Sequence, residues 1–171
     1  MNDKLLWVMV GAPGSGKSWV AKHTLMRGLG WRYISRDEVR FELVGEEEDY
    51  FAHENKVYKV FIERIKRALD EEGVFNVIID ATHINWASRR KLLKALGSDG
   101  SNVICVVIHN TVDEMIENNE TRSGRAVVPR AVLKRMNTQT TDPMDDPVQY
   151  HGVMYINNSR KEKEAYDLAN L

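Results

Sequence analysis

At residues 11–18 the chain reads Gly11-Ala12-Pro13-Gly14-Ser15-Gly16-Lys17-Ser18. This stretch matches the phosphate-binding loop pattern G-x-x-x-x-G-K-[ST] at every fixed position. The apolar run Leu5–Val10 has the length of a strand and leads into the loop, and a helix is predicted from Ser18 onward. The glycines let backbone N–H groups turn inward, and the N-terminus of the helix presents its positive end to a polyphosphate. Residues 11–18 are therefore predicted to bind ATP or another nucleoside triphosphate.

The loop also predicts a magnesium site. Lys17 is expected to reach the β- and γ-phosphates, and the Ser18 hydroxyl is expected to bind Mg²⁺. Residues 74–79 read as a buried strand that ends in Asp80, and an apolar strand with a terminal acid downstream of a phosphate loop is the Walker B pattern. Asp80 is therefore expected to help hold Mg²⁺ through water.

Length and composition limit the class of protein. With 171 residues and 43% hydrophobic side chains, the chain is predicted to be a single domain with its own core. Because the formal net charge is −1, a nucleic-acid partner would have to be held by a local cluster of basic residues. The first four residues are followed by six apolar ones, too few for a signal peptide or a membrane span. We therefore expect a protein with no membrane segment that works in the cytoplasm, or in the host cytoplasm if a phage encodes it.

Hydrophobic periodicity predicts strands that alternate with helices. Strands are predicted at residues 5–10, 31–34, 74–79 and 102–108, with a fifth at 149–156. Helices are predicted from residue 18, from residue 36, and at 50–71, 86–96, 112–119, 130–139 and 160–170, and three of them have N-cap signatures at Ser35, Asn85 and Thr111. This order predicts an α/β fold, a parallel sheet of four or five strands between helices, with residues 141–171 packed on the same domain as a C-terminal extension.

Two groups of charged residues lie where this fold would bind ligands. Arg36, Asp37 and Arg40 fall in the first turns of the helix that follows the second strand, at the carboxyl edge of the sheet. Arg122 and Arg125 lie in the polar stretch 120–128 between two helices, which suggests a mobile lid that places a guanidinium on the transferred phosphoryl group.

Four landmarks in order carry a resemblance: residues 11–18, 35–40, 80–85 with Arg89-Arg90, and 122–129. Their order and content resemble the kinase domain of the bacteriophage and bacterial 5′-hydroxyl polynucleotide kinases, within the zeta-toxin-like group of P-loop phosphotransferases, over residues 5–139. The resemblance implies ATP-dependent phosphorylation of the 5′-hydroxyl end of DNA or RNA, a reaction of nucleic-acid end repair. It makes Asp37 the general base, Arg40 the contact to the neighbouring phosphate of the substrate and Arg122 the lid arginine. It also implies that Arg36, Thr82 and Arg89 bind the substrate.

Several alternatives remain open from the sequence. The lid is one residue longer than the family pattern, so Arg125 competes with Arg122 for the donor phosphates. Arg89 and Arg90, with Lys91 and Lys94, form either a basic strip for a nucleic-acid backbone or an ordinary solvated helix face. The acceptor could instead be a small metabolite, a nucleotide sugar, an antibiotic or a charged tRNA. A nucleotide switch, or an ATPase that moves a partner, is a third interpretation.

Overall fold

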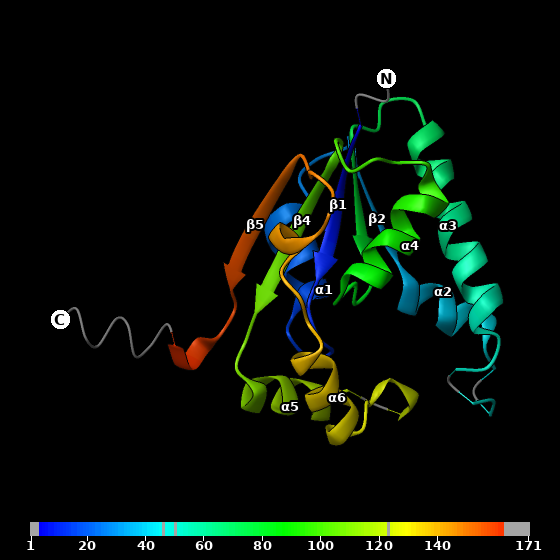
Figure 1. The fold of residues 1–171 in the computed structure, drawn as a ribbon. Helices are drawn as coiled ribbons and strands as arrows, with labels where there is room; N and C mark the ends of the chain where they lie inside the picture. Colours follow the sequence, from blue (N-terminus) through cyan, green and yellow to red (C-terminus); the bar gives the residue numbers. More distant parts are fainter. Residues whose placement is uncertain (1–3, 46, 50, 123, 163–171) are drawn as a thin grey trace.

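Five parallel strands form one sheet in the part of the chain that the structure describes. The structure, a computed structural model, describes residues 4–45, 47–49, 51–122 and 124–162, and of Arg125 it describes the backbone. The strands lie in the order β2-β3-β1-β4-β5. They are β1 (Leu5–Val10), β2 (Trp31–Ser35), β3 (Asn76–Asp80), β4 (Val103–His109) and β5 (Gly152–Asn157). The phosphate-binding loop follows β1, the central strand, so the site lies at the middle of the carboxyl edge of the sheet (Figure 1).

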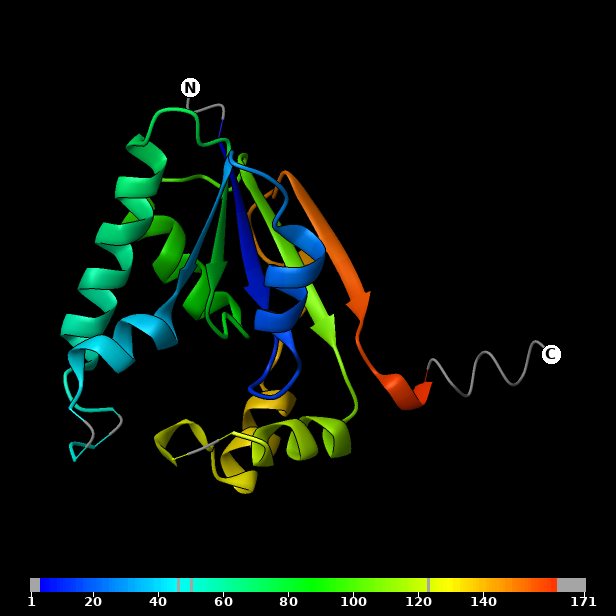
Figure 2. The same cartoon turned by 180° about the vertical axis from the view of Figure 1, so that it is seen from behind.

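Helices cover both faces of this sheet and its carboxyl edge. The helical segments are α1 (Lys17–Val20), η1 (Ala21–Leu25), α2 (Arg36–Leu43), α3 (Glu54–Asp70), α4 (Trp86–Leu96), α5 (Val112–Glu120), η2 (Gly124–Ala126), α6 (Arg130–Thr138) and η3 (Pro143–Asp145). Figure 1 shows α3 and α4 on one face and α5 and α6 beyond the arrowheads of β1 and β4, and Figure 2 shows α1 on the opposite face. The predicted α/β class, with a parallel sheet between helices, is confirmed.

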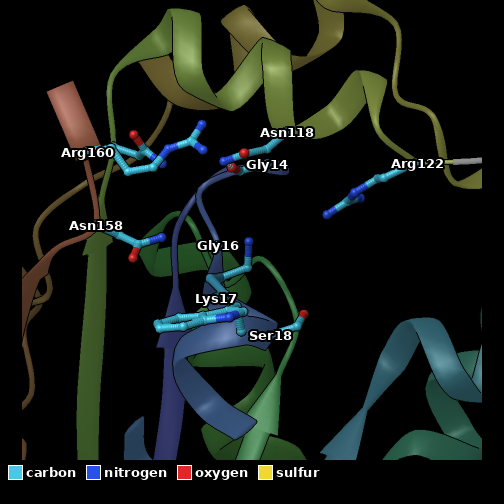
Figure 3. Close-up of a pocket in the computed structure, with 10 residues that line it drawn as sticks. Gly14, Gly16, Lys17, Ser18, Asn118, Arg122, Asn158 and Arg160 are labelled. Carbon is cyan, nitrogen blue, oxygen red and sulfur yellow. Dashed lines mark hydrogen bonds between the residues drawn. The ribbon is translucent and has the colours of Figure 1, made fainter. Parts of the chain in front are cut away.

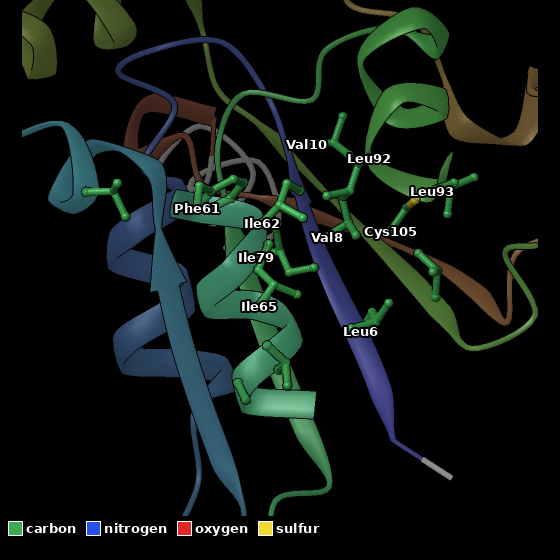
Figure 4. Packing of buried hydrophobic residues seen from close by; sticks show 14 of the residues in the cluster. Leu6, Val8, Val10, Phe61, Ile62, Ile65, Ile79, Leu92, Leu93 and Cys105 are labelled. Carbon is green, nitrogen blue, oxygen red and sulfur yellow. The ribbon is translucent and has the colours of Figure 1, made fainter. Parts of the chain in front are cut away.

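The alternation of side chains along β1 builds a core on each face of the sheet. Leu6, Val8 and Val10 are buried against α3 and α4 (Figure 4), whereas Met9 is buried against the α1 side. Both faces of a central parallel strand are covered in this way, which explains why Leu5–Val10 is a continuous apolar run. Cys105 is fully buried in the first of these clusters, and burial raises the pKa of its thiol to about 12, so the thiol stays protonated.

The three predicted helix caps are confirmed. The side chains of Ser35, Asn85 and Thr111 accept hydrogen bonds from the backbone N–H groups of Glu38, Ser88 and Glu114. Each bond satisfies a donor that the first turn of a helix leaves unpaired. These caps fix where α2, α4 and α5 begin, and therefore which side chains face the carboxyl edge of the sheet.

Some predicted boundaries differ from the structure. The helix predicted for residues 50–71 begins at Glu54, because His53 before it has a left-handed backbone with φ of 61°. The strand predicted for 74–79 is β3 at Asn76–Asp80, and the one predicted for 149–156 is β5 at Gly152–Asn157. Residues 163–170 of the last predicted helix lie outside the described residues. Among the helices that the structure describes, none is long and apolar enough to cross a membrane.

Candidate active site

The phosphate-binding loop has the conformation that its glycines allow. Gly14 and Gly16 have φ angles of 79° and 93°, a backbone region that other residues rarely adopt. A Cβ atom on Gly14 would lie 2.2 Å from the backbone oxygen of Met115, and one on Gly16 would lie 2.1 Å from Nδ2 of Asn158. Both positions therefore favour glycine for conformational reasons, and at Gly14 the backbone of Met115 also leaves no room for a side chain.

Two asparagines hold the loop from outside. Asn118 Nδ2 donates to the Gly14 carbonyl at 2.9 Å, and Asn158 Nδ2 donates to the Ser15 carbonyl at 3.1 Å. Because these carbonyl oxygens are bonded to amides of α5 and of the segment after β5, they are not directed at a phosphate, which they would repel. Neither residue is predicted from the sequence. The position of Asn158 directly after the carboxyl end of a parallel strand is the signal that could have found it.

A cavity of about 510 Å³ opens in front of the loop (Figure 3). It is lined by Gly14, Gly16, Lys17, Ser18, Trp19, Asn110, Asn118, Arg122, Asn158 and Arg160. Inside the loop, Ser15 Oγ is buried and has no hydrogen-bond partner among the described residues, which is costly unless a ligand accepts its proton. The size and the polar lining suit the polyphosphate and sugar of a nucleotide. We call this space the donor cavity.

Lys17 and Ser18 line the donor cavity, and Asp80 is hydrogen-bonded to Ser18. Ser18 Oγ donates to Asp80 Oδ2 at 2.6 Å, and the Tyr33 hydroxyl donates to the same oxygen at 2.5 Å. Lys17 Nζ donates to the Ala12 carbonyl at 2.8 Å. Burial lowers the pKa of Lys17 to about 8, although the nearby Asp80 carboxylate acts in the opposite direction. A bound triphosphate would favour the charged form of this lysine.

The oxygen atoms of Ser18 and Asp80 fit a Mg²⁺ ion. A hydroxyl and a carboxylate are hard oxygen ligands of the kind that Mg²⁺ prefers, and here they are already in contact. Among the described residues there is no group of three or more His, Cys, Asp or Glu side chains that could hold a metal. A Mg²⁺ ion at this place would therefore take its other ligands from the nucleotide and from water.

A second cavity, of about 260 Å³, shares Lys17 with the donor cavity, and we call it the acceptor cavity. Its polar lining is formed by Lys17, Ser18, Arg36, Asp37, Arg40, Glu54, Asp80, Thr82 and Arg122. Its other lining residues are Pro13, Phe51, Ala81, Ala126, Val128, Val132 and Met136. Three of these residues, Lys17, Ser18 and Arg122, also line the donor cavity. The two cavities thus meet at the end of the phosphate-binding loop.

Charged side chains of α2 and α3 form a network in the acceptor cavity. Arg40 is 7% exposed, and it donates through Nη1 to Asp37 and through Nε to Glu54 at 2.8 Å. Arg36 donates through Nη2 to the other oxygen of Glu54 at 2.6 Å. Glu54 therefore holds both arginines. This role is not predicted from the sequence, because Glu54 is fourteen residues from Arg40 and has the position of an ordinary first-turn acid.

Arg122 lines both cavities. Arg122 is half-buried, and its Nη1 lies 3.5 Å from the backbone oxygen of Ala126. Figure 3 shows its side chain entering from the side opposite Asn158 and Arg160. The side chain of Arg125, the other arginine predicted to contact the donor phosphates, lies outside the part of the chain that the structure describes.

Thr82 and Arg89 have different surroundings. The backbone oxygen of Thr82 accepts a hydrogen bond from the Gly11 amide at 3.0 Å, and the residue lines the acceptor cavity. Arg89 is 1% exposed. It therefore belongs neither to a basic strip for a nucleic-acid backbone nor to a solvated helix face, and both of these predictions are wrong for Arg89. Its Nε and Nη2 donate to the two oxygens of Asp146 at 2.6 Å each, and this ion pair buries the guanidinium away from either cavity.

Comparisons with solved structures show which chains share this fold. A chain in the structure of the Pnkp1/Rnl/Hen1 RNA repair complex superposes with a TM-score of 0.65 and 24% identity over 80% of this chain. This chain spans 43% of that one, less than half of its length. The tunicamycin resistance protein of Deinococcus radiodurans has a TM-score of 0.60 and 16% identity over 98% of this chain and 94% of its own. A gluconokinase from Sinorhizobium meliloti 1021 has a TM-score of 0.56 and 17% identity, with 90% and 82% covered.

Comparisons of the sequence itself show the family. No significant match is found among curated proteins. A family model described as an AAA domain matches residues 6–143, which include the phosphate-binding loop, the charged residues of α2, Asp80 and residues 120–128. This match covers most of the chain and agrees with the P-loop geometry described above. The chain therefore belongs to the AAA_33 family of AAA domains.

Proposed function

We propose that this protein is an ATP-dependent kinase that transfers the γ-phosphoryl group of the nucleotide to the 5′-hydroxyl end of DNA or RNA. The observation that carries the proposal is the shared wall of the two cavities. Lys17, Ser18 and Arg122 line both of them, so a triphosphate in the donor cavity would present its last phosphoryl group to the acceptor cavity. A nucleotide switch has no need of a second cavity at this place.

The donor side stabilises negative charge. Phosphoryl transfer depends mainly on positioning and on cations near the γ-phosphoryl and leaving oxygens. Lys17 and Arg122 supply such cations, and the loop amides hold the other phosphate oxygens. Mg²⁺, held by Ser18 and by Asp80 through water, would neutralise charge on the phosphates when bound.

On the acceptor side, Asp37 is proposed as the general base. It lies in the first turn of α2 and lines the acceptor cavity, where a hydroxyl group could approach the shared wall. The ion pair with Arg40 orients its carboxylate. Asp37 would accept the proton of the 5′-hydroxyl group as that oxygen attacks phosphorus. Arg36 and Arg40 would hold the neighbouring phosphate of the acceptor, and Thr82 would help to position it.

The lining of the acceptor cavity supports a nucleotide as the acceptor. The guanidinium groups of Arg36 and Arg40 suit a phosphate, whereas Val128, Val132 and Met136 on the lid side offer an apolar surface for a sugar or base. The likeness to the chain in the Pnkp1/Rnl/Hen1 RNA repair complex has the highest TM-score of those described above. Both observations favour a polynucleotide end.

A kinase of a small hydroxyl compound is the second candidate. This candidate is favoured by the share of each solved structure that the chain covers, which is 94% of the tunicamycin resistance protein and 82% of the gluconokinase. The acceptor cavity of about 260 Å³ would also suit a small molecule.

Transfer of labelled γ-phosphate tests the proposal. The panel of acceptors would contain single-stranded 5′-hydroxyl oligodeoxynucleotides and oligoribonucleotides, a nucleoside 3′-phosphate, gluconate and tunicamycin. We expect the oligonucleotides to be labelled and the two small compounds to stay unlabelled. Exclusive labelling of a small compound would replace this proposal by the second candidate.

The Asp37→Asn variant tests the mechanism. It keeps the size of the side chain but removes the proton acceptor, so kcat should fall by about 10²- to 10⁴-fold while nucleotide affinity stays nearly unchanged. Glu38→Gln is the matched control, because Glu38 lies in the same turn and pairs with Lys22 on the surface. Transfer by Asp37→Asn within tenfold of the unaltered protein would exclude Asp37 as the base.

A further inference from the structure

Three basic side chains of α4 form an exposed group that we call the α4 cluster: Arg90, Lys91 and Lys94. None of them has a carboxylate partner among the residues that the structure describes. Many other surface cations do have one, as Arg32 pairs with Glu71 and Arg64 with Glu42. In a chain with a net charge of −1, the α4 cluster is thus a local excess of positive charge.

Tyr58 connects the α4 cluster to the acceptor cavity. Lys91 Nζ lies 4.1 Å from the centroid of the Tyr58 ring, and Cζ of Arg36 lies 5.5 Å from the same centroid. The Tyr58 hydroxyl also donates to the backbone oxygen of Lys91 at 3.3 Å. Since Arg36 lines the acceptor cavity, one aromatic ring holds a cation of the cavity and a cation of the α4 cluster. Figure 1 shows α3 and α4 side by side, both starting near the carboxyl edge of the sheet.

Within the α2–α3 network the charges of the acceptor cavity balance. Arg36 and Arg40 are ion-paired with Glu54 and Asp37, so this end of the cavity has little net positive charge to attract a polyanion. A single nucleotide could still bind there by hydrogen bonds and apolar contacts. Attraction of a longer strand needs cations beyond the cavity, and the α4 cluster supplies them.

We propose that a single-stranded polynucleotide whose 5′ end occupies the acceptor cavity continues past Tyr58 and along the α4 cluster, which binds its phosphates. This inference rests on the proposed function and adds a surface that selects strands over single nucleotides. Basic grooves that follow the backbone are the general means of binding single strands without sequence preference. The competing interpretation is that the α4 cluster is solvated and that Lys94 complements the helix carboxyl end.

The double variant Lys91→Gln/Lys94→Gln tests the inference. The acceptors are a single-stranded twelve-nucleotide 5′-hydroxyl oligonucleotide and a nucleoside 3′-phosphate, and KM and kcat are measured over a series of salt concentrations. For the oligonucleotide, KM should rise roughly tenfold with kcat unchanged, as expected for two phosphate contacts of the strength of exposed ion pairs. The slope of log KM against log salt should become shallower by about 1.4, and KM for the nucleoside 3′-phosphate should not change.

A variant with the same change in net charge provides the control. Lys4→Gln/Arg27→Gln removes two cations at other places, one before β1 and one after η1, and should leave the oligonucleotide KM unchanged. If both double variants raised the oligonucleotide KM equally, the loss would come from the change in net charge and not from the α4 cluster, and the inference would be overturned. If the unaltered protein labels the oligonucleotide and the Lys91→Gln/Lys94→Gln variant has the same KM and the same salt slope, the inference is overturned but the proposed function is not. Failure of the unaltered protein to label any 5′-hydroxyl end would overturn the proposed function, and the inference with it.

Discussion

Replacing Asp146 by asparagine would test how strongly the segment after α6 is held by the rest of the fold. The side chains of Asp146 and Arg89 are 2% and 1% exposed and are joined by two hydrogen bonds of 2.6 Å. The same carboxylate accepts a bond of 2.7 Å from the Tyr150 hydroxyl. Arg89 also donates to the backbone oxygens of His83 at 3.0 Å and Thr141 at 3.2 Å. Asparagine would leave the guanidinium buried without a counter-charge.

The size of the loss follows from this burial. Removing one partner of a buried ion pair costs about 3–5 kcal/mol, because an uncompensated charge stays in the interior. For a domain of this length, 1 kcal/mol corresponds to about 2–4 °C, so the melting temperature should fall by roughly 6–20 °C. Asp145→Asn, next in the chain and exposed, should change it by no more than about 1 °C.

Denaturant unfolding followed by circular dichroism gives the free energy directly. The double variant Arg89→Met/Asp146→Leu should recover most of the loss, since apolar residues can replace a buried pair at little cost. A loss below about 1 kcal/mol for Asp146→Asn would refute the argument, because the pair would then have to be accessible to water. Equal losses for the single and the double variants would mean that packing volume, and not charge, is what matters.

Three further predictions concern the site and its support. Lys17→Ala and Ser18→Ala should each lower phosphoryl transfer by orders of magnitude without changing the melting temperature, and near-normal turnover in either would remove the donor assignment. Arg122→Ala should lower kcat by roughly 10³-fold and more than Arg125→Ala does, whereas the reverse ranking in single-turnover assays would move the lid role to Arg125. Glu114 is buried, which raises its pKa, but hydrogen bonds from Ser159, Thr111 and the Arg160 and Lys161 amides outweigh this and lower the pKa to about 2. The ionised Glu114 carboxylate therefore contributes to stability above its unfolded pKa, and this contribution is lost as the pH falls from about 5 toward 2. The Glu114→Gln variant should be less stable than the unaltered protein at pH 7 and should lose less stability on acidification. The same dependence of the unfolding free energy on pH in both proteins would contradict this.

Features that depend on neighbouring residues could be predicted from the sequence. The phosphate-binding loop, the strand before it and the N-caps at Ser35, Asn85 and Thr111 follow from residues within a few positions of one another. Hydrophobic periodicity likewise separates strands from helices, and short connections between them impose a parallel sheet. For this reason the fold class was predictable. The placement of Asp37 in the first turn of α2 followed from the same local signals.

Helix boundaries and side-chain environments were less predictable. The helix expected from residue 50 starts at Glu54, since the left-handed backbone of His53 cannot continue a helix. Arg89 was expected on a surface, because it precedes Arg90 and Lys91 in a basic run. Its burial depends on Asp146, which is 57 residues away in the sequence.

Contacts between distant residues were decided by the tertiary structure alone. Asn158 bonds to the loop carbonyl of Ser15 across 143 residues. The donor cavity exists because the phosphate-binding loop, α5 and the segment after β5 meet at one edge of the sheet, and the acceptor cavity exists because α2, α3 and α6 approach the loop at the same edge. No periodicity or local motif reports such contacts, since they depend on the order of strands in the sheet and on the angles at which helices pack. The sequence by itself therefore determined the loop, the strands and helices and the kinds of residue available for chemistry, while the sheet order β2-β3-β1-β4-β5 and the packing on it decided which of those residues share a cavity.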